Sequence, residues 1–307
     1  MISACVPDLG PPQSLLDGPR MLAIRSEPAE VFPGDTVQLT LVAIDAAGAL
    51  VSTDVDWALC ASPKPQVENN VVSADCLSDM VIPISGTTQS QAVTVPLDAC
   101  ARFGPELPPA LPGMPAGRPR DPDDSGGYYQ PVRVTALGMQ AIGLVRIRCG
   151  LAAATPEVAV QFRSNYVANR NPWATKLSIF DGDQMVSAQQ LPASRSLRLR
   201  LVIPSESRES YLRFDPTSQT LVQTAETLRA SWLSAAGSFT LGQTFVTDGS
   251  DPSLYAETQW TAPSQSGPAM LWTVLRDSRG GVWTQSYPVQ ITGSSRSSVG
   301  GQRMRSL

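Results

Sequence analysis

Apolar side chains recur at every second position through much of the chain. Val37, Leu39 and Leu41 fall on one face of an extended segment, and Val55 and Trp57 fall on one face of the next. A period of two predicts half-buried strands, because successive side chains of a strand point to opposite faces. Two such strands around an inward Trp indicate an immunoglobulin-like sandwich.

The second half of the chain repeats this pattern. The apolar positions that we expect inside a second sandwich include Leu197, Leu199, Leu201, Met270, Trp272 and Val274. Arg198 and Arg200 alternate with the leucines and are expected to face solvent. The predicted fold class is therefore all-β, with two immunoglobulin-like antiparallel β-sandwich domains in tandem.

Breaks in the alternation set the expected domain organisation. We predict a lipobox remnant and spacer over residues 1–20, a first sandwich over 21–150 with a Pro-rich loop at 101–131, a linker at 151–171, a second sandwich over 172–292 and a flexible tail at 293–307. Within the linker, Val158 to Phe162 is predicted to form a weak strand. In the last strand of the first sandwich, Arg146 and Arg148 are expected on the solvent face.

The end of the Pro-rich loop holds the side chains most suited to binding. Asp121, Asp123 and Asp124 stand close to the pair Tyr128 and Tyr129. Three carboxylates within four residues can hold Ca²⁺, but the spacing of an EF-hand is absent and acidic turns are common. The two tyrosines suit stacking on a sugar or a peptide, and equally suit packing of the loop base against the sandwich.

The chain contains five cysteines, of which one lies near its start and four lie within the first predicted sandwich. Cys5 stands alone near the start, whereas Cys60, Cys76, Cys100 and Cys149 lie in the first half without metal-ligand spacing. Four cysteines in a turn-rich, exported chain are typical of two disulfides. Of the three possible pairings we favour Cys60 with Cys76 and Cys100 with Cys149.

Composition narrows the classes of function. The net charge is −4 with no basic stripe, which argues against a nucleic-acid partner. The chain contains no His, so it lacks the commonest general base and metal ligand, and we expect neither a metal, a cofactor nor an enzymatic activity. A glycosidase needs only two carboxylates and remains a weaker alternative.

The segment Ile2-Ser3-Ala4-Cys5 resembles the lipobox of bacterial lipoproteins. The resemblance implies cleavage before Cys5 and acylation there, although the charged and apolar regions of a signal peptide do not precede it. The alternative is a free N-terminal Cys. Val6 follows Cys5 where inner-membrane retention would require Asp, which favours the outer membrane, on its periplasmic or cell-surface face. The chain contains no run of about 18 apolar residues, so its sequence predicts no membrane-spanning helix.

Longer motifs carry a family resemblance. The segments PAEVFPGDTVQLTLVA, DWALC, ENNVVSADCL, RPRDPDDSGGYYQPVRV and LWTVLRDSRGGV, together with Cys5, resemble Ig-like outer-membrane lipoproteins of delta-proteobacteria such as myxobacteria. The resemblance spans most of the chain, but PGDTVQL is also similar to many bacterial Ig-like repeats. It implies an outer-membrane lipoprotein and brings no catalytic residues.

These patterns together predict a lipid-anchored envelope protein that acts as a structural or protein-interaction module. Its partners would be the membrane, through lipid at Cys5, and other envelope proteins, with residues 101–130 as the main contact element. The alternative from another class is a carbohydrate-binding module with Tyr128, Tyr129 or Trp173 as its aromatic platform.

Overall fold

Strands dominate the structure, as the alternation predicts. The computed structural model describes residues 12–50, 54–60, 72–78, 81–104, 112, 124–151, 154–248 and 254–293. Helix in these residues is limited to α1 (Ala99–Phe103), α2 (Pro156–Ser164) and the 3-10 turns η1 (Ala74–Leu77) and η2 (Ser205–Ser207). No helix among them is long and apolar enough to cross a membrane.

The first sandwich consists of two facing sheets. One sheet contains β1 (Arg20–Glu27), β3 (Thr36–Asp45), β4 (Gly48–Leu50) and β7 (Ser90–Thr94), with β1 and β7 on either side of β3. The other has the order β2 (Glu30–Val31), β9 (Met139–Arg148), β8 (Gly127–Ala136), β5 (Asp56–Cys60) and β6 (Val81–Ile84).

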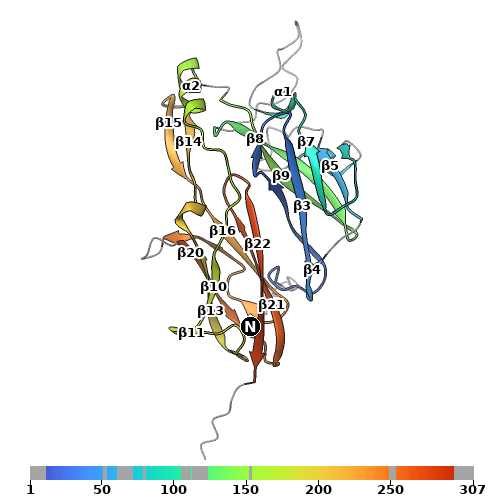
Figure 1. Cartoon of the computed structure of the whole chain (residues 1–307), viewed down its shortest axis with the longest axis vertical. Helices are drawn as coiled ribbons and strands as arrows, with labels where there is room; N and C mark the ends of the chain where they lie inside the picture. Colours follow the sequence, from blue (N-terminus) through green and yellow to red (C-terminus); the bar gives the residue numbers. More distant parts are fainter. Residues whose placement is uncertain are drawn as a thin grey trace, which may run out of the picture.

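The second sandwich repeats this arrangement. Its first sheet has the order β11 (Gln184–Val186), β10 (Lys176–Asp181), β13 (Ser196–Ile203), β20 (Leu254–Thr261) and β17 (Ser238–Phe239), with β19 (Thr247–Asp248) also on β20. Its second sheet has the order β12 (Leu191–Pro192), β22 (Val282–Thr292), β21 (Gly267–Arg276), β16 (Arg229–Ser234) and β18 (Gln243–Phe245). A separate hairpin, β14 (Ser210–Asp215) and β15 (Thr220–Ala225), rises beside the first sandwich (Figure 1).

Both sandwiches have the immunoglobulin-like topology. In each, a very short strand pairs in parallel with the last strand, β2 with β9 and β12 with β22, while the other pairings are antiparallel. In each, a buried Trp lies on the corresponding strand of the second sheet, Trp57 on β5 and Trp232 on β16. A Trp at this strand is a hallmark of immunoglobulin domains. The predicted fold class is confirmed.

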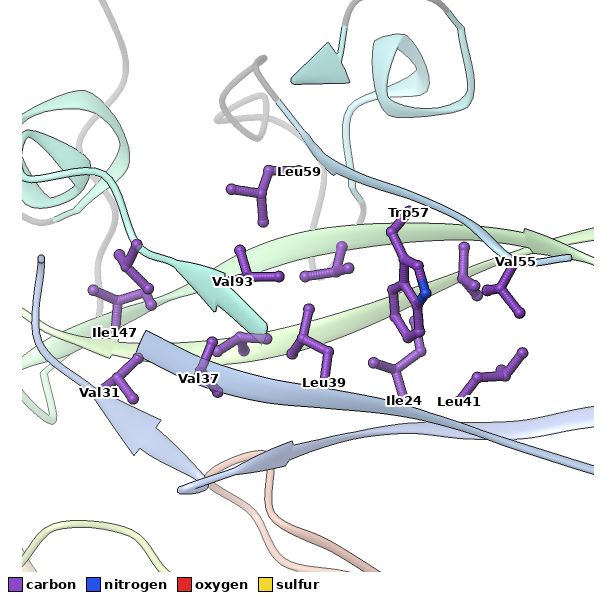
Figure 2. Close-up of a cluster of buried hydrophobic side chains, with 14 of the residues drawn as sticks. Ile24, Val31, Val37, Leu39, Leu41, Val55, Trp57, Leu59, Val93 and Ile147 are labelled. Atoms are coloured by element: carbon purple, nitrogen blue, oxygen red, sulfur yellow. The ribbon is translucent and has the colours of Figure 1, made fainter. Parts of the chain in front are cut away.

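Each sandwich encloses its own apolar core. Figure 2 shows the Trp57 ring between the sheets of the first sandwich, with Ile24 and Val55 close to it. Trp57 is fully buried, and its indole Nε1 donates a hydrogen bond to the carbonyl of Thr88 at 2.9 Å, so burial leaves no unpaired donor. In the second core, the three leucines of β13 point inward as predicted.

A third apolar cluster joins the two sandwiches. It contains Leu16 from the N-terminal segment, Ile44 from β3, Leu233 from β16, Trp272 and Val274 from β21, and Val282 from β22. The prediction that Met270, Trp272 and Val274 point into the second core is therefore wrong. Leu271 and Leu275 point there, and the other face of β21 packs against the first sandwich. Both faces of this strand are apolar because both are covered.

The N-terminal segment is part of the folded structure. Residues 1–11 lie outside the described part, but Leu16 is only 2% exposed, and its N–H donates to the carbonyl of Ser234 at 2.9 Å. The Ser234 N–H in turn donates to the carbonyl of Ser14 at 2.9 Å. Within the spacer predicted over residues 1–20, residues 14–16 thus lie against the second sandwich, where Leu15 forms a short parallel pairing with Ser234 of β16.

The predicted weak strand from Val158 to Phe162 is a helix. Thr155 caps α2 by accepting a hydrogen bond from the Val158 N–H, and Pro156 occupies the first turn. Both features favour a helix start and outweigh the low helix propensity of the valines. Phe162 is buried against Gly126, where a Cβ atom would overlap its ring.

Both predicted disulfides are confirmed. Cys60, at the end of β5, pairs with Cys76 in η1, and Cys100 in α1 pairs with Cys149 after β9. The first staples the end of β5 to the segment before β6, and the second holds α1 against the end of the last strand of the first sandwich.

Removing the disulfides should destabilise the first sandwich to different extents. The paired cysteines are 16 and 49 residues apart. The chain-entropy model then predicts a loss of about 3 kcal/mol for the double variant Cys60→Ser/Cys76→Ser and about 4 kcal/mol for Cys100→Ser/Cys149→Ser. Urea unfolding followed by Trp fluorescence measures both losses. Midpoints equal to that of the parent protein would contradict the expectation.

Candidate functional site

The chain between α2 and β10 lies along both sandwiches and defines the candidate site. We call residues 165–173 the strap. Asn171 shows how it bridges: its side-chain Nδ2 donates to the carbonyl of Ser26 in β1 at 2.7 Å, and its Oδ1 accepts from the Val282 N–H in β22 at 2.8 Å. One amide side chain therefore connects the two sandwiches directly.

The strap is held on the first sandwich by a buried ion pair. Glu30 on β2 faces Arg146 on β9, with 3.5 Å between Oε1 and Nε. The Glu30 carboxylate also accepts a hydrogen bond from the Asn169 N–H at 2.7 Å and another from the Tyr166 hydroxyl. Burial, with a further contribution from Glu30, raises the pKa of Tyr166, so the phenol stays protonated and keeps donating.

Arg146 corrects a prediction. It was expected on the solvent side of β9 but is 1% exposed. Its Nη2 donates to the carbonyl and the hydroxyl of Ser125 at 2.8 and 2.9 Å, and its Nη1 donates to the Tyr129 hydroxyl at 3.1 Å. Arg148, also predicted to face solvent, is half-buried, with its guanidinium 3.8 Å from the centre of the Tyr166 ring. The strap covers the face of β9 that the alternation assigns to water.

On the second sandwich the strap is held by a buried guanidinium. Arg279, in the turn between β21 and β22, donates through Nη2 to Glu209 at 2.8 Å and through Nε to Glu226 at 2.7 Å. Its Nη1 donates to the strap carbonyl of Val167 at 2.8 Å. Glu209 accepts two further bonds from Arg170 of the strap, from the backbone N–H at 2.9 Å and from Nε at 2.6 Å.

The turn that carries Arg279 is shaped by Asp277. Its Oδ1 accepts from the backbone N–H groups of Arg279 and Gly281, both at 2.8 Å. A Cβ atom on Gly281 would overlap the Asp277 carboxylate, so glycine is required at this position. An Asp side chain that accepts hydrogen bonds from backbone N–H groups two and four residues ahead is typical of a tight turn.

The acids of this second centre outnumber its fully buried base. Burial, together with the nearby Asp277 carboxylate, raises the pKa of Glu226 to about 7 against the opposing effect of Arg279. Burial also raises the pKa of Asp277. Burial alone would lower the pKa of Arg279, but Glu226 and Glu209 more than offset it and hold that pKa above its ordinary value.

The tyrosines predicted for binding lie at the base of the 101–131 loop. Tyr128 and Tyr129 belong to β8, which begins at Gly127, and Ala101 to Phe103 belong to α1, so the loop is shorter than predicted. Tyr128 is 2% exposed and donates to the side chain of Gln130 at 2.7 Å. It cannot serve as an exposed platform. Tyr129 is half-buried against Arg146 and Gly280.

The predicted acidic group is only partly described. Asp121 and Asp123 lie outside the described residues. Asp124 forms an ion pair with Arg213 of the β14–β15 hairpin, and its carbonyl accepts from the Phe214 N–H at 2.8 Å. The described residues contain no group of three acidic or thiol side chains placed to hold a metal. Whether the loop binds calcium, the alternative raised by its three carboxylates, is therefore not tested by the described residues.

Trp173 and Cys5 complete the predicted sites. Trp173, at the end of the strap, is half-buried beside the Arg170 guanidinium, 5.9 Å from its ring centre. Cys5 lies outside the described residues. Chemically, the hydrogen bonds and ion pairs of the strap hold the two sandwiches in one orientation.

Among known proteins, only solved structures show a similarity to this chain, at low sequence identity and low TM-score. No family model and no curated protein matches the chain. Invasin, a bacterial integrin-binding protein, matches over 90% of this chain and 39% of its own at 10% identity and a TM-score of 0.22. A marsupial T cell receptor matches over 87% and 99% at 10% identity and 0.29.

A third match is SGBP-B of the Bacteroides ovatus mixed-linkage glucan utilization locus, solved with a heptasaccharide. It matches over 90% of this chain and 47% of its own at 12% identity and a TM-score of 0.19. The chain thus spans about two fifths of invasin and about half of SGBP-B. At such TM-scores the fold assignment stands on the strand order, and no activity transfers.

Removing the guanidinium of Arg279 should lower the stability of the fold, because it leaves the Glu209 and Glu226 carboxylates buried without their partner. For Arg279→Ala we expect the free energy of unfolding to fall by about 3–5 kcal/mol. The matched control is Arg195→Ala, which removes an exposed pair with Asp181 and should cost less than about 1 kcal/mol. Denaturant unfolding of both variants gives the comparison. Equal losses in the two would show that the buried centre contributes no more than a surface pair.

Proposed function

We propose that the protein is a non-enzymatic, lipid-anchored cell-envelope protein that serves as a structural or protein-interaction module. The observation that carries the proposal is the strap, whose side chains and backbone are bonded to buried charges in both sandwiches. Two domains on a flexible linker would place their ends at random relative to one another. Two domains fixed by a strap hold a binding surface at a set distance and direction from an anchor.

The position of the N-terminal segment supports a directional arrangement. Residues 14–16 lie against the second sandwich, whereas α1 and the start of β8, which flank the 101–131 loop, lie at the far end of the first sandwich (Figure 1). Lipid at Cys5 of an outer-membrane protein would then hold the second sandwich towards the bilayer. The end of the first sandwich that carries α1 and the start of β8 would face away from the bilayer, where other envelope proteins can reach it.

A protein partner fits this geometry better than a sugar. The carbohydrate-binding alternative needs an exposed aromatic platform, but Tyr128 is buried and Tyr129 lies half-buried against Arg146. Trp173 is half-buried at the end of the strap. The rings proposed for sugar stacking are thus engaged in holding the protein together.

Acylation gives the first test. In the protein purified from its native cells, mass spectrometry should find a diacylglycerol-modified Cys5 at the N-terminus, and the protein should fractionate with the outer membrane. The variant Cys5→Ala should lose membrane association, whereas Pro7→Ala, which keeps the thiol, should retain it. An unmodified Cys5 in a protein recovered from the aqueous fraction would contradict the anchor.

The loop gives the second test. Detergent-solubilised protein with a chemical cross-linker should capture envelope proteins, and replacement of residues 105–122 by a Gly/Ser segment should abolish capture while the unfolding midpoint is unchanged. Glycan-array binding that survives the replacement, with no protein captured by the parent, would favour the carbohydrate module instead.

A further inference from the structure

A cavity of about 820 Å³ opens where the N-terminal segment and β1 face the second sandwich. Residues 12–14 and 20–22 form one side of it, and residues of β16, β17, β18 and β21 form the other. A cavity of this volume is large enough for a small organic ligand. It is separate from the strap, because none of residues 165–173 lines it.

The wall of this cavity carries positive charge without negative charge. Arg20 and Arg276 are among its lining residues, and none of these residues is Asp or Glu. Arg20 is partly offset by Asp17, with 3.7 Å between Nη2 and Oδ1, and it donates to the Leu15 carbonyl at 3.2 Å. Arg276 donates through Nη2 to the Leu22 carbonyl at 2.6 Å, and within the described part of the chain it has no carboxylate partner.

A second arginine lies directly opposite Arg276 in the sheet. Arg229 on β16 pairs in register with Arg276 on β21, so both side chains leave the same face of the sheet. Like charges in directly opposite positions repel each other. Arg229 is exposed and forms no ion pair with any carboxylate of the described residues. Burial, with a further contribution from Arg229, lowers the pKa of Arg276, whereas the carboxylate partners of Arg279 hold its pKa above the ordinary value. Two adjacent positive charges are therefore left uncompensated.

Uncharged polar groups lie on the same face of the sheet beside the two arginines. The neighbouring cross-strand row consists of Gln243, Ser231 and Val274, and all three line the cavity. The Ser231 hydroxyl and the Gln243 amide form no hydrogen bond to another described residue, so both can bond to a ligand. Phe245, the neighbour of Arg229 on β18, is 64% exposed and adds apolar surface at the same edge.

We propose that this cavity binds a small organic phosphate, whose phosphate group contacts Arg276 and Arg229 and whose remaining part lies over Ser231 and Gln243. At neutral pH a phosphate monoester carries close to two negative charges, which match the two uncompensated guanidinium groups. The planar fork of a guanidinium donates two parallel hydrogen bonds to phosphate oxygens. A single carboxylate would leave one of the two charges uncompensated. A soluble phosphate and the phosphate head group of a lipid present the same chemistry to this site.

Titration calorimetry of the full chain tests the site, in a parent that carries Cys5→Ala so that no acyl chain contributes. Phenyl phosphate should bind at one saturable site per chain. Benzoate, a monoanion with the same ring, should bind at least about tenfold more weakly, as expected for the loss of charge-assisted hydrogen bonds. Co-sedimentation with vesicles of phosphatidylcholine, alone or with an equimolar amount of phosphatidic acid, identifies the source of the phosphate. Binding to phosphatidic acid alone assigns the site to a lipid head group, and binding of phenyl phosphate shows a site open to soluble phosphates.

Variants of the two arginines separate this site from nonspecific attraction of anions. Arg276→Gln and Arg229→Glu should each weaken binding by about tenfold or more. The control Arg163→Gln, at an exposed arginine of α2 outside the cavity, should bind as the parent does. Arg229→Glu places an opposite charge beside Arg276, so its unfolding midpoint should be no lower than that of the parent, and its loss of binding is then not a loss of fold. The proposal is overturned if neither phosphate probe binds the parent, if benzoate binds as tightly as phenyl phosphate, or if Arg229→Glu binds as the parent does.

Discussion

The orientation of the two sandwiches depends on how a buried guanidinium is satisfied. Moving an ion of this size out of water costs several kcal/mol even after relaxation, so Arg279 is stable only where its partners are in place. Those partners come from three separate segments: Glu209 before β14, Glu226 after β15, and the Val167 carbonyl of the strap. A shift of any one segment would leave a buried donor or acceptor unpaired. The Arg279 guanidinium therefore fixes the positions of these three segments relative to one another.

The apolar cluster between the sandwiches has a different role. Trp272, Val274 and Ile44 bury apolar area and so favour association, but burial is not directional and would tolerate sliding of one surface over the other. The hydrogen bonds of Asn171 to Ser26 and Val282, and those of Asn169 and Tyr166 to Glu30, remove that freedom. Association and orientation are supplied by separate sets of residues, which is what a module that presents a surface in a fixed direction requires.

Sequence patterns predict this fold where one face of a strand is buried and fail where both are. The leucines of β13 alternate with outward arginines, and their placement is correct because that sheet has one face on water. In β21 every position from Leu271 to Leu275 is buried, so period two cannot say which set faces which core. Arg146 fails for the same reason, since a charge on the outer face of a strand is assigned to solvent unless a covering layer is known. The valines of α2 favour a strand, but Thr155-Pro156 is a helix start, and the structure follows the helix start.

The joint itself could not be located from the sequence, because its charged residues are spread from Glu30 to Arg279 and each of its ion pairs joins segments that lie far apart in the chain. The choice of arginine over lysine in this chain is nevertheless consistent with such a joint. Of 23 basic residues only Lys64 and Lys176 are lysine. Arginine offers five donors in a planar fork and is more weakly hydrated than an ammonium, so it is the cation that can be buried among several acceptors. Arg146 donates to a hydroxyl, a carbonyl and a phenol at once, and Arg279 to two carboxylates and a carbonyl. A lysine has three donors, but all leave one nitrogen, so it does not match acceptors that are spread around a planar fork. A chain that rests its domain orientation on buried cations therefore has a physical reason to use arginine at those positions.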